Sequence, residues 1–184
     1  KSGLMPKYYI NSILEKDIFE IKKIDSIKMN MLLKSLARNE STTVSNNKLI
    51  KDISENEDME VDKRTISDYL DILDKLNLLN NQPAYSLNYR SPDRIGKNIK
   101  RHFVDPSLAA ALLNINKDKL IGDLKTFGFL FEALVERDLN IYMDYLNGKI
   151  YHFRDNVTGL EVDTILEFEN GEYAAVEIKL GFNQ

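Results

Sequence analysis

The stretch LEVDTILEFENGEYAAVEIKLG, residues 160–181, decides how the C-terminal half of the chain folds. Apolar and polar residues alternate on both sides of the segment ENGE, which is typical of the two strands of a β-hairpin. With strict alternation, Asp163 and Ile165 share one side of the first strand and Thr164 takes the other. The hairpin therefore carries one acidic residue in its first arm and a second, Glu177, in the other arm.

The length of the loop between the two strands sets their register. A two-residue turn over residues 170–171 would place Asp163 opposite Ile178 and would mix apolar with charged residues on each face. A three-residue loop over residues 169–171, with its glycine in the left-handed conformation, matches the apolar faces and places Asp163 opposite Glu177. We favour the three-residue loop because it keeps one face of the hairpin apolar.

Two carboxylates that face one another repel, and a bound cation removes this cost. Magnesium binds one or two carboxylates together with water and phosphate oxygens, and a neighbouring lysine can hold a phosphate or help to activate water. Asp163 and Glu177 are therefore candidate Mg²⁺ ligands and catalytic residues, and Lys179 is a candidate catalytic lysine. The chemistry that this set favours is the hydrolysis of phosphodiester bonds.

A third acidic residue, Glu132, belongs to a helix that the apolar spacing predicts over residues 120–146. It lies along the apolar stripe of this helix, where a carboxylate is costly unless it is paired. Two interpretations stand. Glu132 is either a further metal ligand of the site or a carboxylate that is solvated or paired with an arginine such as Arg154.

The N-terminal half of the chain has helical spacing of its apolar residues in two opening segments and again over residues 66–76. Ser45, Asp62 and Asp105 are candidate N-caps, and Pro106 suits the first position of a helix. The segment LLNNQPAYSLNYR is expected to form a ribbon with a turn at residues 80–83. Three helices followed by a ribbon are the pattern of a winged helix.

A winged helix that binds DNA would present the first residues of its second helix to the bases, which makes Lys63 and Arg64 candidate nucleic-acid contacts. However, residues 51–75 contain nine acidic and four basic residues, so this surface would repel phosphates. The alternative is a winged helix that serves only as a packing module. Lys97 and Arg101 lie in a more basic segment and are further candidates for nucleic-acid binding.

Composition limits the other classes of protein and of site to which the chain could belong. The chain has 184 residues, a formal net charge of −4 and no cysteine, which excludes disulfides and thiolate metal sites. No apolar run approaches the roughly 20 residues of a membrane span, so we expect no membrane partner and a cytoplasmic location. His102 and His152 lie in apolar segments and are interpreted as structural, so a zinc site or a Ser-His-Asp site is not expected.

Together these parts resemble a known family. The helix with Glu132 and the strands KIYHFRD, LEVDTIL and AAVEIKLG are similar to the α-β-β-β start of the PD-(D/E)xK nuclease superfamily. The resemblance is closest to the DUF4143-type C-terminal region of bacterial and archaeal AAA-type ATPases, in which phrases similar to HFVDPSLAAALL and FGFLFEALVERDL occur in this order after a winged helix.

The resemblance implies an α+β fold with two domains: an all-α winged-helix domain over residues 1–90 and a DUF4143-type, restriction-endonuclease-like α-β-β-β unit over residues 91–184 that is incomplete at its C-terminus. It implies Asp163 and Glu177 as Mg²⁺ ligands, Lys179 as the catalytic lysine, and Glu132 as an acid that ligates directly or through water. The ATPase module would lie before Lys1, and no GxxxxGK[ST] phosphate loop occurs here, so ATP is not bound by this chain.

Two functions of different class follow. The chain is either a regulatory module of an ATPase that holds the ATPase part of the parent protein, DNA or a further protein, or a magnesium-dependent nuclease. The first reading is favoured by the acidic helices and the second by the acids and the lysine of the hairpin. A divalent ion held by Asp163 and Glu177 would distinguish them.

Overall fold

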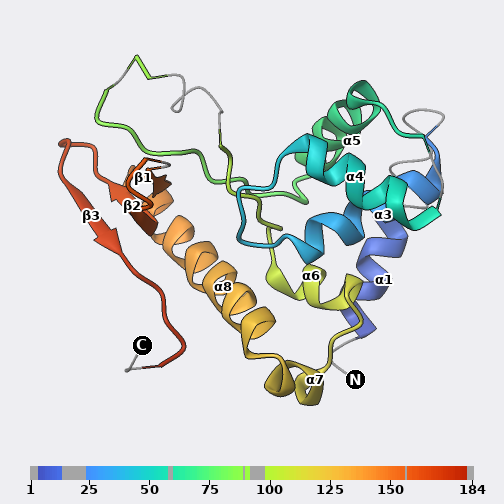
Figure 1. Ribbon diagram of the computed structural model, residues 1–184. Helices are drawn as coiled ribbons and strands as arrows, with labels where there is room; N and C mark the ends of the chain where they lie inside the picture. Colours follow the sequence, from blue (N-terminus) through green and yellow to red (C-terminus); the bar gives the residue numbers. More distant parts are fainter. Residues whose placement is uncertain are drawn as a thin grey trace.

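The computed structural model describes residues 4–13, 24–57, 60–88, 90–91, 98–155 and 157–181 of the chain. Its N-terminal part is helical. The helices there are α1 (Leu4–Ser12), α3 (Ser26–Arg38), α4 (Asn46–Glu57) and α5 (Lys63–Lys75). They gather at one end of the molecule (Figure 1).

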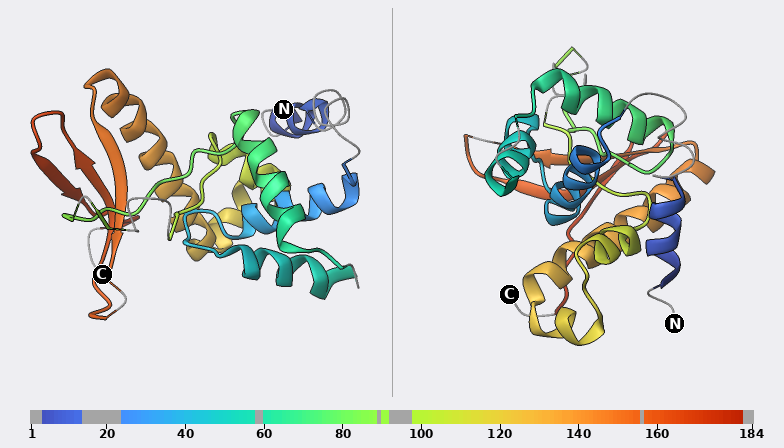
Figure 2. Two further views of the ribbon diagram at one scale, coloured as in Figure 1. Left: turned by 90° about the horizontal axis from the view of Figure 1, so that it is seen from above. Right: turned by 90° about the vertical axis from the view of Figure 1, so that its right-hand side faces the viewer.

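The C-terminal part contains three more helices and a sheet. The helices are α6 (Pro106–Leu112), α7 (Lys117–Gly122) and α8 (Leu124–Tyr145), and the strands are β1 (Lys149–Arg154), β2 (Glu161–Glu167) and β3 (Tyr173–Val176). Long helix α8 lies against the sheet at the end of the molecule away from α4 and α5, and two further views show the same separation (Figure 2). The described residues therefore form a mixed α+β fold with one small antiparallel sheet.

The predicted N-caps are confirmed. The side chain of Asp62 accepts a hydrogen bond from the backbone of Thr65 at 2.7 Å, and Asp105 accepts one from Ser107 at 2.8 Å with Pro106 at the start of α6. These oxygens satisfy backbone donors that have no partner inside the helix. The single helix predicted over residues 120–146 is wrong, because the chain breaks at Asp123, which caps α8 through the backbone of Thr126.

The ribbon predicted within residues 78–90 is also wrong in its pairing. Leu79 pairs with Phe103 and Gln82 pairs with Lys100, both in antiparallel fashion, so the partner strand comes from residues 100–103. No turn at residues 80–83 reverses the chain. The same extended segment then reaches β1, where Ala84 pairs with His152 in parallel.

The sheet has the order β1-β2-β3 with antiparallel neighbours. Residues 83–85 follow the outer edge of β1, because the backbone of Tyr85 donates to His152 at 2.7 Å and His152 donates to Pro83 at 3.1 Å. Helix α8 contacts β1 and β2 on one face of the sheet. The sheet thus connects to the helical end both through α8 and through this extended segment.

The hydrophobic core lies mainly between α3, α4 and α5. The side chains of Leu32, Leu49, Ile66 and Leu73 are completely buried, which reflects the apolar stripes of the three helices. The core cluster also contains Phe103, Leu108, Ala109 and Leu130. Apolar packing thus continues across residue 90, and the division into domains at that position stays a prediction.

None of the helices in the described ranges has both the length and the apolar character that crossing a bilayer demands.

Candidate functional site

A β-bulge in β2 places the acidic residue of this strand. Tyr151 pairs with Ile165 and Phe153 pairs with Val162, so one residue of β1 lies opposite two of β2, Asp163 and Thr164. Bulges of this kind bend a strand and re-aim a side chain. The strict alternation predicted for β2 is therefore wrong at this point.

The consequence of the bulge is that two consecutive side chains face α8. The hydroxyl of Thr164 donates to Oε1 of Glu136 on α8 at 2.8 Å, and Asp163 lines a cleft together with Glu132 of the same helix. Val162 and Ile165 both line a cavity on the other face of the sheet.

The predicted hairpin register is confirmed. Thr164 pairs with Val176, and the pairing continues to Glu167 and Tyr173. The loop closes through hydrogen bonds between Phe168 and residues 171–172, and Gly171 has a φ of +84° in the left-handed region. The pairing of β2 with β3 ends at Thr164 and Val176. Asp163 and Glu177 are the next residues outward from this pair, so the two acids lie where the arms of the hairpin separate.

The cleft has a volume of about 480 Å³ and lies between the first half of α8 and residues 177–180. All four residues predicted for the metal and catalytic site line it: Glu132, Asp163, Glu177 and Lys179. The other described residues of α8 that line this side are Leu124, Lys125, Gly128, Phe129 and Phe131. In Figure 1, the chain after β3 runs alongside α8, in agreement with this lining.

Asp163 occupies the centre of this group of charges. One oxygen of its carboxylate accepts a hydrogen bond from the backbone of Ile178 at 2.7 Å, which ties the bulge to the chain after β3. Burial and the negative charge of Glu177 raise the pKa of Asp163, while the hydrogen bond from Ile178 and the charge of Lys100 oppose this rise. A positive charge placed beside Asp163 would therefore be favourable.

Glu177 and Lys179 form an ion pair at the mouth of the cleft. Their Oε1 and Nζ atoms are 2.7 Å apart, and each side chain is about half exposed. The contact with Glu177 raises the pKa of Lys179. In water such a pair contributes little stability and exchanges readily for other partners, so Glu177 and Lys179 remain available to a ligand.

Glu132 is paired with a lysine and not with Arg154. Its carboxylate contacts the ammonium group of Lys100, and its side chain is 14% exposed. Arg154 instead lies 3.7 Å from Glu161. Burial raises the pKa of Glu132 to about 7, although the charge of Lys100 opposes this rise. Glu132 is thus a paired carboxylate, as one of the two interpretations holds, but its partner is Lys100 and not an arginine.

A buried network of charges continues behind Glu132. Lys100 contacts Glu136 at 2.9 Å, and Nε2 of His102 lies 2.8 Å from the other oxygen of Glu136. Nδ1 of His102 lies 3.1 Å from Glu40. Among the residues that the structure describes, neither Nε2 of His102 nor Oε2 of Glu136 finds a hydrogen-bond partner, so their contact is described as an ion pair.

The network sets the charge of its members. Burial alone would lower the pKa of His102, but its contacts with Glu136 and Glu40 outweigh burial and raise the pKa to about 9. Burial alone would raise the pKa of Glu136, but His102 and Lys100 lower it to about 2. His102 is therefore a buried cation and Glu136 a buried anion at neutral pH. The interpretation of His102 as a structural residue is consistent with this position.

Sequence reasoning missed Glu40, Lys100, His102 and Glu136 as neighbours of the site. One signal was present: Glu136 follows Glu132 by four residues, so the two carboxylates share one face of α8. Lys100 lies between Lys97 and Arg101 in the basic segment, which suggests a solvated side chain, but it is only 5% exposed. Its place behind the cleft follows from the pairing of residues 79–82 with 100–103, which the sequence did not reveal.

Lys63, Arg64 and Arg101, the described candidates for nucleic-acid contacts, do not line the cleft. Lys63 and Arg64 are exposed in the first turn of α5. Arg101 is partly buried, and its guanidinium donates to Asn46 at 3.0 Å. Lys97 lies outside the described residues. Nucleic-acid binding by these residues stays a prediction.

The described ranges contain no group of three or more His, Cys, Asp or Glu side chains arranged to hold a metal ion. Glu132 lines the cleft, but its carboxylate is engaged by Lys100. A cation in the cleft would therefore take two carboxylates, Asp163 and Glu177, and would complete its coordination with water or a ligand oxygen.

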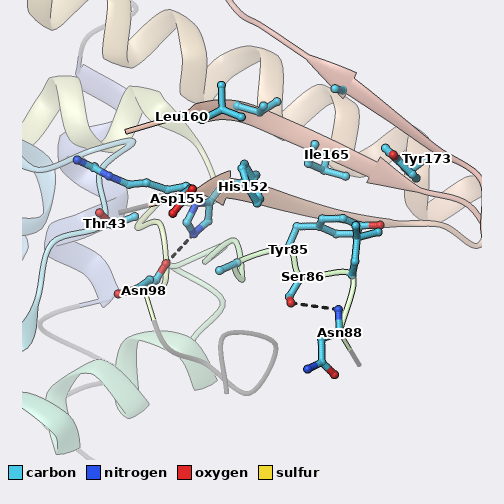
Figure 3. Close-up of a pocket in the computed structure, with 16 residues that line it drawn as sticks. Thr43, Tyr85, Ser86, Asn88, Asn98, His152, Asp155, Leu160, Ile165 and Tyr173 are labelled. Atoms are coloured by element: carbon cyan, nitrogen blue, oxygen red, sulfur yellow. Dashed lines mark hydrogen bonds between the residues drawn. The ribbon is translucent and has the colours of Figure 1, made fainter. Parts of the chain in front are cut away.

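A larger cavity, of about 900 Å³, lies on the opposite face of the sheet. Tyr85, His152, Ile165 and Tyr173 are among the residues that line it (Figure 3). Nε2 of His152 lies 2.6 Å from the carbonyl oxygen of Asn98. The rings of Tyr85 and Tyr173 are 5.8 Å apart. This cavity contains none of the paired acids of the cleft, so we assign the candidate site to the cleft beside α8.

Comparison with known proteins gives one match. The family model described as a domain of unknown function, DUF8612, matches residues 4–119, which is more than half of the chain. The chain belongs to this family. No curated protein and no solved structure matches it.

Membership of DUF8612 corrects the resemblance stated from the sequence. The family that matches is neither DUF4143 nor a winged-helix or nuclease family, so the identification as the C-terminal region of an AAA-type ATPase was wrong. The DUF8612 match ends at residue 119, before every described residue that lines the cleft. Any function of the cleft must therefore be argued from its geometry.

Proposed function

We propose that the cleft between α8 and residues 177–180 binds Mg²⁺ and hydrolyses phosphodiester bonds. The observation that carries this proposal is the gathering of Glu132, Asp163, Glu177 and Lys179 in one cleft. The finer description of residues 91–184 as a restriction-endonuclease-like unit belongs to this proposal. Its support is the order of α8 followed by three strands, with the acids on the α8 side.

The donor set fits a hard cation. Mg²⁺ uses one or two carboxylates and retains several water molecules, and Asp163 and Glu177 offer two carboxylates in a cleft that is open to solvent. Burial and the charge of Glu177 make the ionised form of Asp163 unfavourable without a cation. Glu132 would act through water, because its carboxylate is engaged by Lys100.

Lys179 has a defined part in this proposal. While Glu177 is free of metal, it holds the ammonium group of Lys179 at 2.7 Å. If Glu177 held a cation, the ammonium group of Lys179 would be released from this carboxylate and would be free to contact a phosphate oxygen of the substrate. When bound, Mg²⁺ would supply charge to stabilise the phosphate and lower the pKa of a water molecule.

The test is a calorimetric titration of the chain with Mg²⁺ and Mn²⁺. We expect binding that disappears in Asp163→Asn and in Glu177→Gln and that persists in Glu161→Gln, a control acid exposed on β2. The same proteins are then assayed with bis(4-nitrophenyl) phosphate and with single- and double-stranded oligonucleotides. Equal binding by the wild type and Asp163→Asn would refute the proposal.

A second function, a non-catalytic module that binds DNA or a protein partner, is favoured by the pairing of charges in the cleft. Glu132 is held by Lys100, and Glu177 is held by Lys179. Such pairs are compatible with a purely structural role. This alternative predicts no metal binding at all, and its DNA-binding form predicts that Lys63→Glu with Arg64→Glu weakens binding to an oligonucleotide.

A further inference from the structure

Lys100 is a buried cation that touches two parts of the proposed site at once. Its ammonium group contacts the carboxylate of Glu132, lies 2.9 Å from Glu136, and donates to the backbone carbonyl of Asp163 at 3.2 Å. Three donors of one ammonium group thus meet three acceptors. Two of these acceptors belong to residues that line the cleft.

The backbone of Lys100 is fixed as firmly as its side chain. Its N–H donates to Gln82 at 3.0 Å and its carbonyl accepts from Gln82 at 2.9 Å, so residue 100 is held in an extended pair. The side chain of Gln82 also donates to the carbonyl of Tyr151 in β1 at 3.0 Å. The ammonium group therefore approaches the bulge of β2 from a rigid support.

The carbonyl that Lys100 contacts is the one in the bulge. In a bulge the extra residue leaves the regular ladder of the sheet, so its backbone needs other partners to keep one conformation. The carboxylate of Asp163 is fixed separately by the backbone N–H of Ile178. Lys100 and Ile178 together hold the backbone and the side chain of the same residue.

From this geometry we infer that Lys100 is a positioning residue of the cleft, which orients Glu132 and the bulge at Asp163 so that the acids can share a divalent cation. This inference rests on the function proposed above. Lys100 has no atom among those that line the cleft, so it acts through its neighbours and does not touch the substrate.

The ion pairs behind Lys100 support this role. Glu136 accepts from Lys100 and from Thr164 through the same oxygen, Oε1, and faces His102 with the other. Glu136 is therefore held on three sides and cannot swing with Lys100. Removal of the ammonium group would leave Glu132 and Glu136 as neighbouring buried acids without their shared cation.

The residues of the proposed site come from two parts of the sequence. Lys100 lies within residues 4–119, the region that matches DUF8612, whereas the residues of the cleft follow it. A cation that is supplied by one region thus orders acids that are supplied by the other. The two regions would then act as one unit in metal binding.

The experiment measures Mn²⁺ affinity by calorimetry for the wild type, Lys100→Met and Lys100→Arg, with Lys149→Met as an exposed lysine control in β1. Changing a residue that orients a metal ligand typically costs 10–100-fold in affinity. We expect the Mn²⁺ affinity of Lys100→Met to fall by roughly that factor. We expect Lys100→Arg to retain most of the wild-type affinity and Lys149→Met to retain all of it. If Lys100→Met does not fold, Lys100→Gln takes its place, because its amide keeps a donor for the carbonyl of Asp163.

A second readout follows the geometry without metal. Hydrogen exchange of the Ile178 amide reports its bond to Asp163, and we expect faster exchange in Lys100→Met and near wild-type exchange in Lys100→Arg.

If the wild type does not bind Mn²⁺, the proposed function fails and this inference fails with it. If the wild type binds Mn²⁺ and the charge-removing variant binds it equally well, the inference alone is overturned.

Discussion

His102 and Glu136 form a buried ion pair that joins the extended segment after residue 98 to helix α8, with 2.8 Å between Nε2 and Oε2. Glu40 contacts the other nitrogen of the same ring at 3.1 Å and also accepts from the backbone of Phe103. A protonated histidine between two carboxylates fixes the relative position of three segments that are far apart in the sequence. The stability of the fold should therefore depend on the charge of this ring.

The pH dependence of unfolding tests this point. The pKa of His102 is raised from 6.5 to about 9, so the folded state binds the proton more tightly than the unfolded state. The resulting stability is complete below pH 6.5 and is lost as the pH rises through 9. We expect the free energy of unfolding in urea to fall over this range by on the order of 3 kcal/mol.

Two variants isolate the contribution of His102. The decline above pH 7 should be absent in His102→Gln and should persist in His152→Gln, because burial lowers the pKa of His152 and this ring is neutral in that range. Glu132, with a pKa raised to about 7, adds a loss of stability mainly between pH 4.5 and 7, which lies below the range above pH 7 in which the two variants are compared. An unchanged slope in His102→Gln would contradict the assignment of a buried cation.

Thr164→Val should destabilise the protein by about 1.5–3 kcal/mol. The side chain of Thr164 is completely buried and donates to the ionised carboxylate of Glu136 at 2.8 Å. Valine has nearly the same shape but no donor, and hydrogen bonds to charged groups are worth this much. Urea denaturation measures the change, with Thr158→Val as a control on the exposed turn. Equal, small effects of both substitutions would argue against a specific role for the buried bond.

Gly171→Ala should destabilise the hairpin by about 1–2 kcal/mol. Gly171 has a φ of +84°, and a side chain in this left-handed region costs roughly that amount. No atom lies within 4 Å of the added Cβ, so the effect would be one of backbone conformation alone. Gly181→Ala is the matched control, since its Cβ also meets nothing and its φ is not in that region. Thermal unfolding of both variants compares them directly.

Lys179→Met should separate catalysis from metal binding. Its ammonium group contacts only Glu177 among the ion pairs described, so its removal leaves Asp163 and Glu177 free to hold a cation. We expect Mn²⁺ affinity equal to or above that of the wild type, because a competing cation is gone, together with a large loss of phosphodiesterase activity. Lys125→Met, which removes the other lysine that lines the cleft, is the comparison. A full rate in Lys179→Met would remove this residue from the proposed mechanism.

The sequence predicted the local features that depend on neighbouring residues. Asp62 and Asp105 cap helices as expected because capping requires only a suitable side chain beside the first turn. The three-residue loop followed from matching apolar faces. It brought Asp163 and Glu177 to the end of the paired region, where the two arms separate, and the cleft contains every residue predicted for it.

Features that depend on contacts between distant segments were not predicted. The sequence predicts that Lys100 is a solvated cation in a basic segment. Only the pairing of residues 79–82 with 100–103 brings its side chain to Glu132 on α8. The resemblance to the C-terminal region of an ATPase rested on short phrases of apolar and charged residues, and the family match overturned it. The bulge in β2 was missed because alternation within one strand does not encode contacts with a distant helix, such as the hydrogen bond of Thr164 to Glu136 on α8.

The bulge has a consequence for how related sequences should be aligned. A homologue that lacks one residue between positions 162 and 165 would restore regular pairing with β1 and would leave one side chain, in place of both Asp163 and Thr164, on the α8 face of the sheet. Such a homologue could keep every acidic residue and still lose the arrangement. Deletions at this point of an alignment, more than substitutions of the acids, would then mark the members in which the cleft has changed its use.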